Sequence, residues 1–165
     1  TSVTDPSAAI QIADEQMGVV MDNKSNMVWE RGGKFLSKEL SNISYPGNSV
    51  SSIKSCTQML LQAAQHTISV NELKGKSIMS MLSQYLEQPV NLTGCTLDET
   101  LYFVSNGKPV IGMLSETHAV LITGYTSSTV SWMDPVTMRK TTVSISIAEK
   151  MFERAGYVFV SYVSN

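Results

Sequence analysis

The stretch that decides the fold is His118-Ala119-Val120-Leu121-Ile122-Thr123-Gly124-Tyr125. It is filled with β-branched and aliphatic residues, which favour a buried β-strand. Shorter runs of the same kind lie before and after it along the chain. We therefore predict strands over 109–114, 118–125, 129–133, 140–144 and 157–163. Because short polar turns separate several of these runs, neighbouring strands are expected to pair in antiparallel fashion.

Helical patterns dominate the first two thirds of the chain. Apolar residues recur at helical spacing over 52–66 and again over 76–87, before Pro89. Capping boxes predict further helix starts at Ser69–Glu72, Thr96–Glu99 and Ser146–Glu149. Near the N-terminus we expect a helix over 5–18 and a hairpin over 19–29, and no regular element over 30–49. Since helices come first and an antiparallel sheet second, the predicted fold class is α+β.

The composition excludes several classes of function. The chain has 165 residues, a length typical of one domain, and a net charge of −2 with 16% charged residues. A chain so poor in charge lacks the basic face that nucleic-acid binding needs. No apolar run approaches the roughly 20 residues of a membrane span. Two cysteines and two histidines suit neither a disulfide scaffold nor a zinc site. We expect a single domain over 1–165, without metal or cofactor.

The clearest chemical signal is a histidine with an aspartate one hairpin away. His118 opens the central strand directly after a polar turn, and Asp134 ends the next strand. Directly opposed residues of antiparallel strands lie about 4.5–5.5 Å apart. A carboxylate at this distance can bond the imidazole and fix its tautomer. A purely structural histidine–aspartate pair would give the same pattern.

Cys56 is the candidate nucleophile. It lies in the first turns of the 52–66 helix, where the helix dipole and a nearby imidazolium would stabilise a thiolate. A thiol, a histidine and a group that orients the histidine are the parts that thiol catalysis needs. The alternative is that Cys56 is a small buried hydrophobe, because it shares an apolar stripe with Ile53 and Leu60.

Cys95 leaves two further possibilities open. It precedes a capped helix and is followed closely by His118, so it is a second candidate nucleophile. Cys56 and Cys95 could also be joined in a disulfide, which would require an oxidising compartment.

The order of motifs in the second half resembles a known family. Gly107–Ile111 leads to His118–Tyr125, then to Trp132–Pro135, and finally to a helix and strand over 148–163. This order resembles the papain-like cysteine peptidases of family thirty-nine, the double-glycine leader peptidases, and more closely their stand-alone bacterial relatives. The resemblance covers residues 50–165 and leaves 1–49 as an N-terminal elaboration. It implies a papain-like fold, with N-terminal helices packed on a C-terminal antiparallel sheet.

The resemblance also implies roles for individual residues. Cys56 would be the nucleophile, His118 the general base and Asp134 the residue that orients it, with the Cys56 N–H as one oxyanion donor. In the family, the nucleophile stands at the start of a helix and is usually followed by glycine, whereas Thr57 stands here. A glutamine a few residues earlier completes the family's oxyanion hole. Residues 47–55 contain no glutamine, so the candidate replacements are Asn48 and, as an alternative, a serine of the 49–52 run.

The implied function is peptide-bond hydrolysis by a Cys–His–Asp triad on a peptide or protein substrate. Because Thr57 stands in place of glycine and residues 47–55 lack glutamine, an inactive peptidase-like domain that binds a peptide or a cell-surface partner is the alternative. A structural extracellular module with a Cys56–Cys95 disulfide is the third interpretation. The sequence begins with Thr1 and not with a methionine, so we expect it to be a fragment that lacks its targeting segment. An extracellular or cell-surface location in a bacterium is the corresponding expectation.

Overall fold

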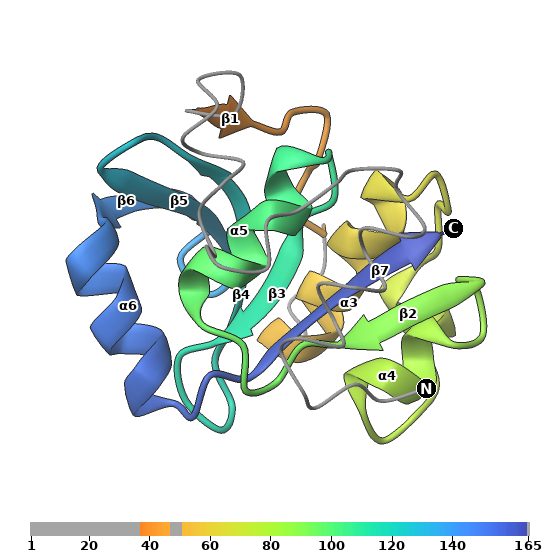
Figure 1. Ribbon diagram of the computed structural model, residues 1–165. Coiled ribbons are helices and arrows are strands. Elements are labelled where there is room, and N and C mark those ends of the chain that lie inside the picture. The colour runs from red at the N-terminus through yellow and green to blue at the C-terminus, as the bar shows by residue number, and fades with distance from the viewer. Residues whose placement is uncertain (1–36, 47–50, 165) are drawn as a thin grey trace.

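The structure is a computed structural model that describes residues 37–46 and 51–164 (Figure 1). Three expectations of the sequence lie outside these residues: the helix over 5–18, the hairpin over 19–29 and the position of Asn48. The described part is α+β, as predicted, with helices packed on an antiparallel sheet. No helix in it combines the length and the apolar character that crossing a membrane requires.

Within residues 37–46 and 51–164, the sheet has seven strands and every pairing in it is antiparallel. The strands are β1 (Lys38–Glu39), β2 (Gln88–Asn91), β3 (Val110–Met113), β4 (Ala119–Tyr125), β5 (Thr129–Asp134), β6 (Arg139–Ser144) and β7 (Phe159–Ser164). Their order is β2-β7-β3-β4-β5-β6, and β1 pairs with β4. The five predicted strands are confirmed as β3 to β7. The short strands β1 and β2 were not expected.

Strand β4 separates two apolar cores, because successive side chains of a strand point to opposite faces. Val120 and Ile122 pack in one core, together with Trp132 of β5. Ala119 and Leu121 pack in the other. All seven residues of β4 are buried, which explains why its sequence is a continuous apolar run rather than an alternating one.

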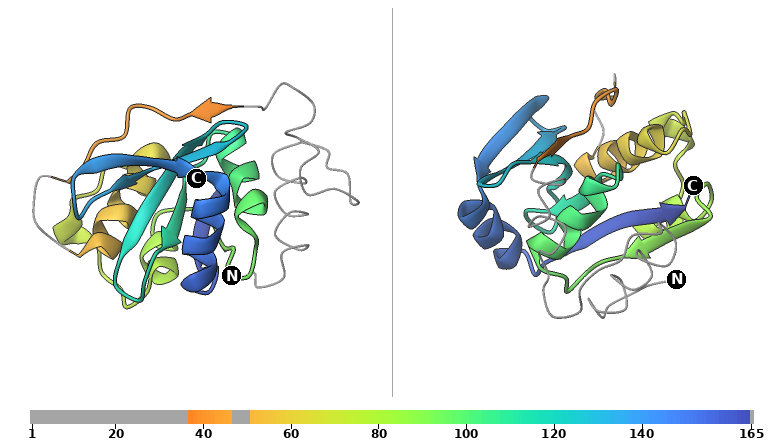
Figure 2. Two further views of the ribbon diagram at one scale, coloured as in Figure 1. Left: turned by 90° about the vertical axis from the view of Figure 1, so that its left-hand side faces the viewer. Right: turned by 45° about the horizontal axis from the view of Figure 1, so that its top comes forward.

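Helices cover both faces of the sheet. The helices α5 (Leu97–Ser105) and α6 (Ile145–Arg154) contribute to the core that contains Val120. The helices α3 (Ser52–Ala63) and α4 (Ile78–Leu82) contribute to the core that contains Leu121. Figure 2 shows α3 and α6 on opposite sides of the sheet. A short 3-10 helix, η1 (Val70–Glu72), follows α3.

The capping boxes predicted helix starts with mixed success. At Thr96 the box is complete: the Thr96 hydroxyl accepts from the Glu99 N–H, and the Glu99 carboxylate accepts from the Thr96 N–H. Ser69 caps only the 3-10 helix η1. The box at Ser146 was wrong, because Ser144 caps α6 two residues earlier through the Ile147 N–H. The helix α6 begins directly after β6 ends at Ser144, so the end of that strand sets its start and the motif at Ser146 does not.

The predicted helix over 76–87 is the largest error in the fold. It is confirmed only as the short α4, which ends at Leu82. The chain then enters the edge strand β2, where Pro89 is paired with Tyr162 of β7. Proline is accepted at a sheet edge, where no partner needs its missing N–H. Pro89 thus marks a strand here as well as the end of a helical pattern.

The segment 37–46 pairs with β4 through β1 and brings Tyr45 close to Asp134. Glu39 of β1 pairs with Gly124, where a Cβ would lie 2.9 Å from the Lys38 carbonyl oxygen, so a glycine is required. Further along, Ser44 and Gln62 of α3 exchange two hydrogen bonds of 3.1 and 3.2 Å. At least this part of the N-terminal elaboration is built onto the core.

Candidate functional site

His118 and Asp134 form the hydrogen-bonded pair that the sequence predicted. The His118 Nε2 lies 2.9 Å from the Asp134 Oδ1. The Asp134 side chain is buried, whereas 32% of the His118 side chain is exposed. The same carboxylate oxygen accepts the Val136 N–H at 2.9 Å, which holds it in place at the start of the β5–β6 turn.

This bond determines the histidine tautomer. A carboxylate can only accept hydrogen bonds, so the Nε2 must carry the proton that it donates to Asp134. In the neutral ring, the Nδ1 then holds a lone pair. Within residues 37–46 and 51–164, no hydrogen bond engages this Nδ1. The pair therefore presents a base to whatever occupies the neighbouring space.

Ser52 occupies the position beside His118 at the start of a helix. It is the first residue of α3, and its hydroxyl is clamped by the main chain on both sides of the histidine. The Oγ donates to the Thr117 carbonyl oxygen and accepts from the Ala119 N–H, both at 2.9 Å. The sequence indicated Ser52 only as one of the serines over 49–52 that could donate to an oxyanion, because nothing in the sequence distinguishes it from its neighbours.

Cys56 lies one full turn inside α3, about 6 Å further along the helix axis than Ser52. Its side chain is 0% exposed and packs in the core that contains Ala119 and Leu121. Burial, and then the negative charge of Asp134, raise the pKa of the Cys56 thiol far above its ordinary value. Both effects disfavour the thiolate, which is the nucleophilic form. The geometry thus counts against Cys56 as the nucleophile.

The Cys56 N–H is also unsuited to the oxyanion role that the resemblance implied. Inside an α-helix each N–H bonds to the carbonyl four residues earlier, which for Cys56 is that of Ser52. The unpaired N–H groups of a helix belong to its first turn. In α3, the Ser51 hydroxyl already accepts the Lys54 N–H of that turn.

Cys95 does not belong to this site. It is 2% exposed and packs in the core on the other face of the sheet, with α5. The cysteines are not joined in a disulfide, so the Cys56–Cys95 bridge is absent from the structure. These are the two cysteines of the chain, and both of their thiols are buried.

Tyr45 borders the site from the segment 37–46. Its ring packs against the core that contains Cys56. Burial raises the pKa of the Tyr45 hydroxyl, the charge of Asp134 raises it further, and the Asp134 main chain partly offsets this. The phenol therefore stays protonated and neutral at physiological pH. No sequence signal pointed to Tyr45, since the pairing of β1 with β4 brings it here.

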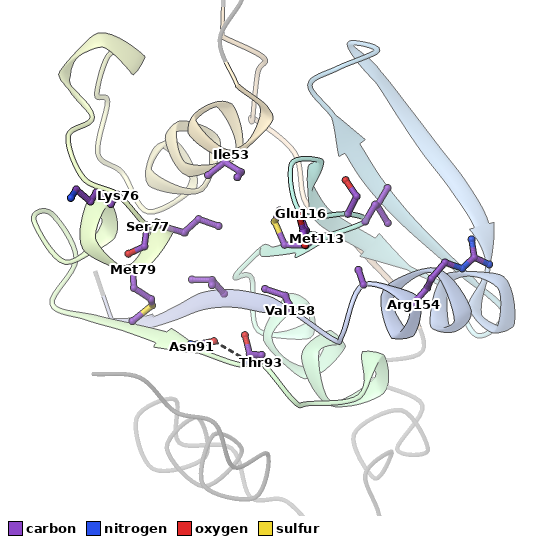
Figure 3. Close-up of a pocket in the computed structure, with 15 residues that line it drawn as sticks. Ile53, Lys76, Ser77, Met79, Asn91, Thr93, Met113, Glu116, Arg154 and Val158 are labelled. Carbon is purple, nitrogen blue, oxygen red and sulfur yellow. Dashed lines mark hydrogen bonds between the residues drawn. The ribbon is translucent and has the colours of Figure 1, made fainter.

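An apolar groove of about 770 Å³ adjoins the site (Figure 3). Ile53, the neighbour of Ser52, lies on one wall, and the turn that precedes His118 contributes Glu116. Met113 of β3 and Val158, just before β7, line it from the sheet. This groove is large enough for several side chains of an extended peptide.

Comparison with known proteins places this arrangement in a family. The model of the peptidase C39-like family matches residues 54–164. A crystal structure from Bacillus anthracis, described as that of a C39-like peptidase, is similar to this chain with a TM-score of 0.64. The two sequences are 20% identical, and the similarity covers 78% of this chain and 98% of that chain. No curated protein gives a significant match.

The structural likeness shows the fold alone, which is the α+β papain-like fold expected from the sequence. The family match reaches from the first turn of α3 to the end of β7, and so includes both His118 and Asp134. Because it spans well over half of the sequence, this chain belongs to the peptidase C39-like family.

Proposed function

We propose that this peptidase-like domain binds peptide segments in the groove beside His118 and does not cleave them through a thiol. The observation that carries the proposal is the position of Ser52. It stands at the start of α3 beside the histidine, and its hydroxyl is engaged in two hydrogen bonds. The Cys56 thiol is buried one turn deeper.

Neither side chain is prepared to attack a carbonyl group. A thiol must ionise and reach the substrate, whereas the pKa of Cys56 is raised by burial and its side chain is 0% exposed. A serine must give its proton to a base. The single proton of the Ser52 hydroxyl is donated to the Thr117 carbonyl oxygen instead.

Binding is supported by the groove. Its lining includes Ile53, Met113 and Val158, and it meets the His118 turn at Glu116. Burying apolar peptide side chains there contributes roughly 25 cal/mol for each Å² removed from water. A domain with this groove but without a reactive nucleophile can bind a peptide without cleaving it.

Slow hydrolysis through Cys56, His118 and Asp134 is the second candidate. It is supported by the 2.9 Å bond between His118 and Asp134, because this bond leaves a basic Nδ1. The Asn48 amide would be the second oxyanion donor. This function would require the first turn of α3 to open, since Cys56 must become accessible.

A defined library of synthetic peptides tests the proposal. The protein is incubated with the library, separated from unbound peptide by filtration, and the retained peptides are identified by mass spectrometry. We expect intact peptides with the wild type and with Cys56→Ala in equal amounts. Ile53→Lys should retain fewer, because it places a charge in the apolar wall. Retention of no peptide, or recovery of fragments with the wild type alone, would overturn the proposal.

A further inference from the structure

We infer that the groove selects peptides in which an apolar stretch is flanked by acidic residues, which Lys76 and Arg154 recognise. This inference rests on the proposed function and names the ligand chemistry of the same site. It comes from the distribution of charge around the groove rather than from the groove's size.

Lys76 and Arg154 lie at opposite ends of the groove (Figure 3). Lys76 precedes the short helix α4, and Arg154 is the last residue of α6. Both are exposed, and among the described residues neither forms an ion pair. Lys140, in contrast, is paired with Glu39. The two groove cations are therefore available to carboxylates of a ligand.

The floor between the two cations is apolar. Met113 and Val160 are buried residues of β3 and β7, and Ile53 and Val158 are partly buried. Figure 3 shows Val158 between the ends at which Lys76 and Arg154 lie. A ligand that spans the groove thus meets a positive charge, an apolar surface and a second positive charge.

Glu116 disfavours negative charge in the middle of the ligand. It lies on the wall between the two ends, is exposed, and forms no ion pair with any described residue. A carboxylate in the centre of the ligand would face this like charge, whereas a neutral residue would not. The complementary ligand is therefore acidic at both ends and uncharged between them.

Three fluorescent peptides with one apolar core test this inference by fluorescence polarisation. The peptides carry glutamate, glutamine or lysine at both ends. Exposed ion pairs contribute little, so we expect each glutamate to tighten binding about two- to fivefold over glutamine at low salt. The lysine peptide should bind more weakly than the glutamine peptide. These differences should shrink at about 0.5 M salt, where charges are screened within a few Å.

Lys76→Gln and Arg154→Gln should each reduce the preference for glutamate, and the double variant should abolish it. Arg139→Gln is the matched control, because Arg139 is an exposed cation of β6 that does not line the groove. Equal binding of the three peptides would overturn this inference and leave peptide binding intact. Binding of none of them would overturn the proposed function as well. A preference that survives in the double variant would show that other residues read the charge.

Discussion

The Ser52 hydroxyl accepts a 2.9 Å hydrogen bond from the N–H of Ala119, the residue that follows His118. With the matching bond from Ser52 to the Thr117 carbonyl, it fixes the start of α3 against both sides of the histidine. The resemblance to cysteine peptidases predicted a thiol at a helix start. The structure has a hydroxyl there, held by the backbone, which is why we propose recognition without cleavage.

Ser52→Ala should lower the free energy of unfolding by about 1–3 kcal/mol, because it leaves a buried N–H and a carbonyl without their partner. Urea denaturation measures the change. Ser83→Ala is the control, since the exposed Ser83 hydroxyl bonds only to the Met79 carbonyl of its own helix. If both variants lose the same stability, the two hydrogen bonds of Ser52 beside His118 stabilise the fold no more than the exposed bond of Ser83 does.

Ser52→Cys in a Cys56→Ala background should create a reactive thiol. The new side chain would stand at the N-terminus of α3, against the main chain on either side of His118. A helix N-terminus and a nearby imidazolium both lower the pKa of a cysteine. We expect this variant to react with iodoacetamide at pH 7 faster than the native wild type does. The gain should fall when His118→Ala is added. An equally slow reaction would show that position 52 is not the site beside the histidine.

The Cys56 thiol should be inert in the folded protein. Native protein should remain unmodified by iodoacetamide at pH 8, and should gain two adducts after unfolding, as counted by mass spectrometry. Because burial raises the pKa of Cys56 above its ordinary value of 9.0, the unfolded state releases the proton first as the pH rises. Stability should therefore fall above about pH 9, and less steeply in Cys56→Ala. Rapid native modification of Cys56 would refute its burial.

Asp98, in the first turn of α5, provides a pH test in the acid range. Burial, and then the charges of Glu149 and Glu99, raise the pKa of its carboxyl above the ordinary 3.8. The folded state thus binds the proton more tightly, and this contribution to stability is lost as the pH rises through the folded pKa. Asp98→Asn should be more stable than the wild type at pH 7, and the difference should vanish near pH 3. Glu72→Gln is the control, because it makes the corresponding change of a carboxyl to an amide at an exposed site.

The sheet was predictable because its pattern is local. The runs that became β3 to β7 are apolar or β-branched and are bounded by turns, and the pairing of His118 with Asp134 follows from one hairpin. β2 was not predictable in this way. Its four residues contain Pro89, which resembles a helix terminator until β7 is beside it.

The residue that stands at the start of α3 could not be derived from periodicity. The apolar stripe of α3 indicates which residues face the core, but serines at 49, 51, 52 and 55 are all acceptable caps. A shift of one turn decides whether Cys56 lies at the helix start or in the core. Only the tertiary structure brings three further residues around the site, because they come from separate segments of the chain: Tyr45, Lys76 and Arg154.

The rate of peptide hydrolysis distinguishes a domain that binds peptides without cleaving them from a working thiol peptidase. Wild type and Cys56→Ala are incubated with the same mixed peptide library, and new N-termini are counted over time by mass spectrometry. We expect the same background rate for both proteins, with peptide binding retained. Hydrolysis by the wild type that disappears in Cys56→Ala and in His118→Ala would contradict it and establish a working thiol peptidase.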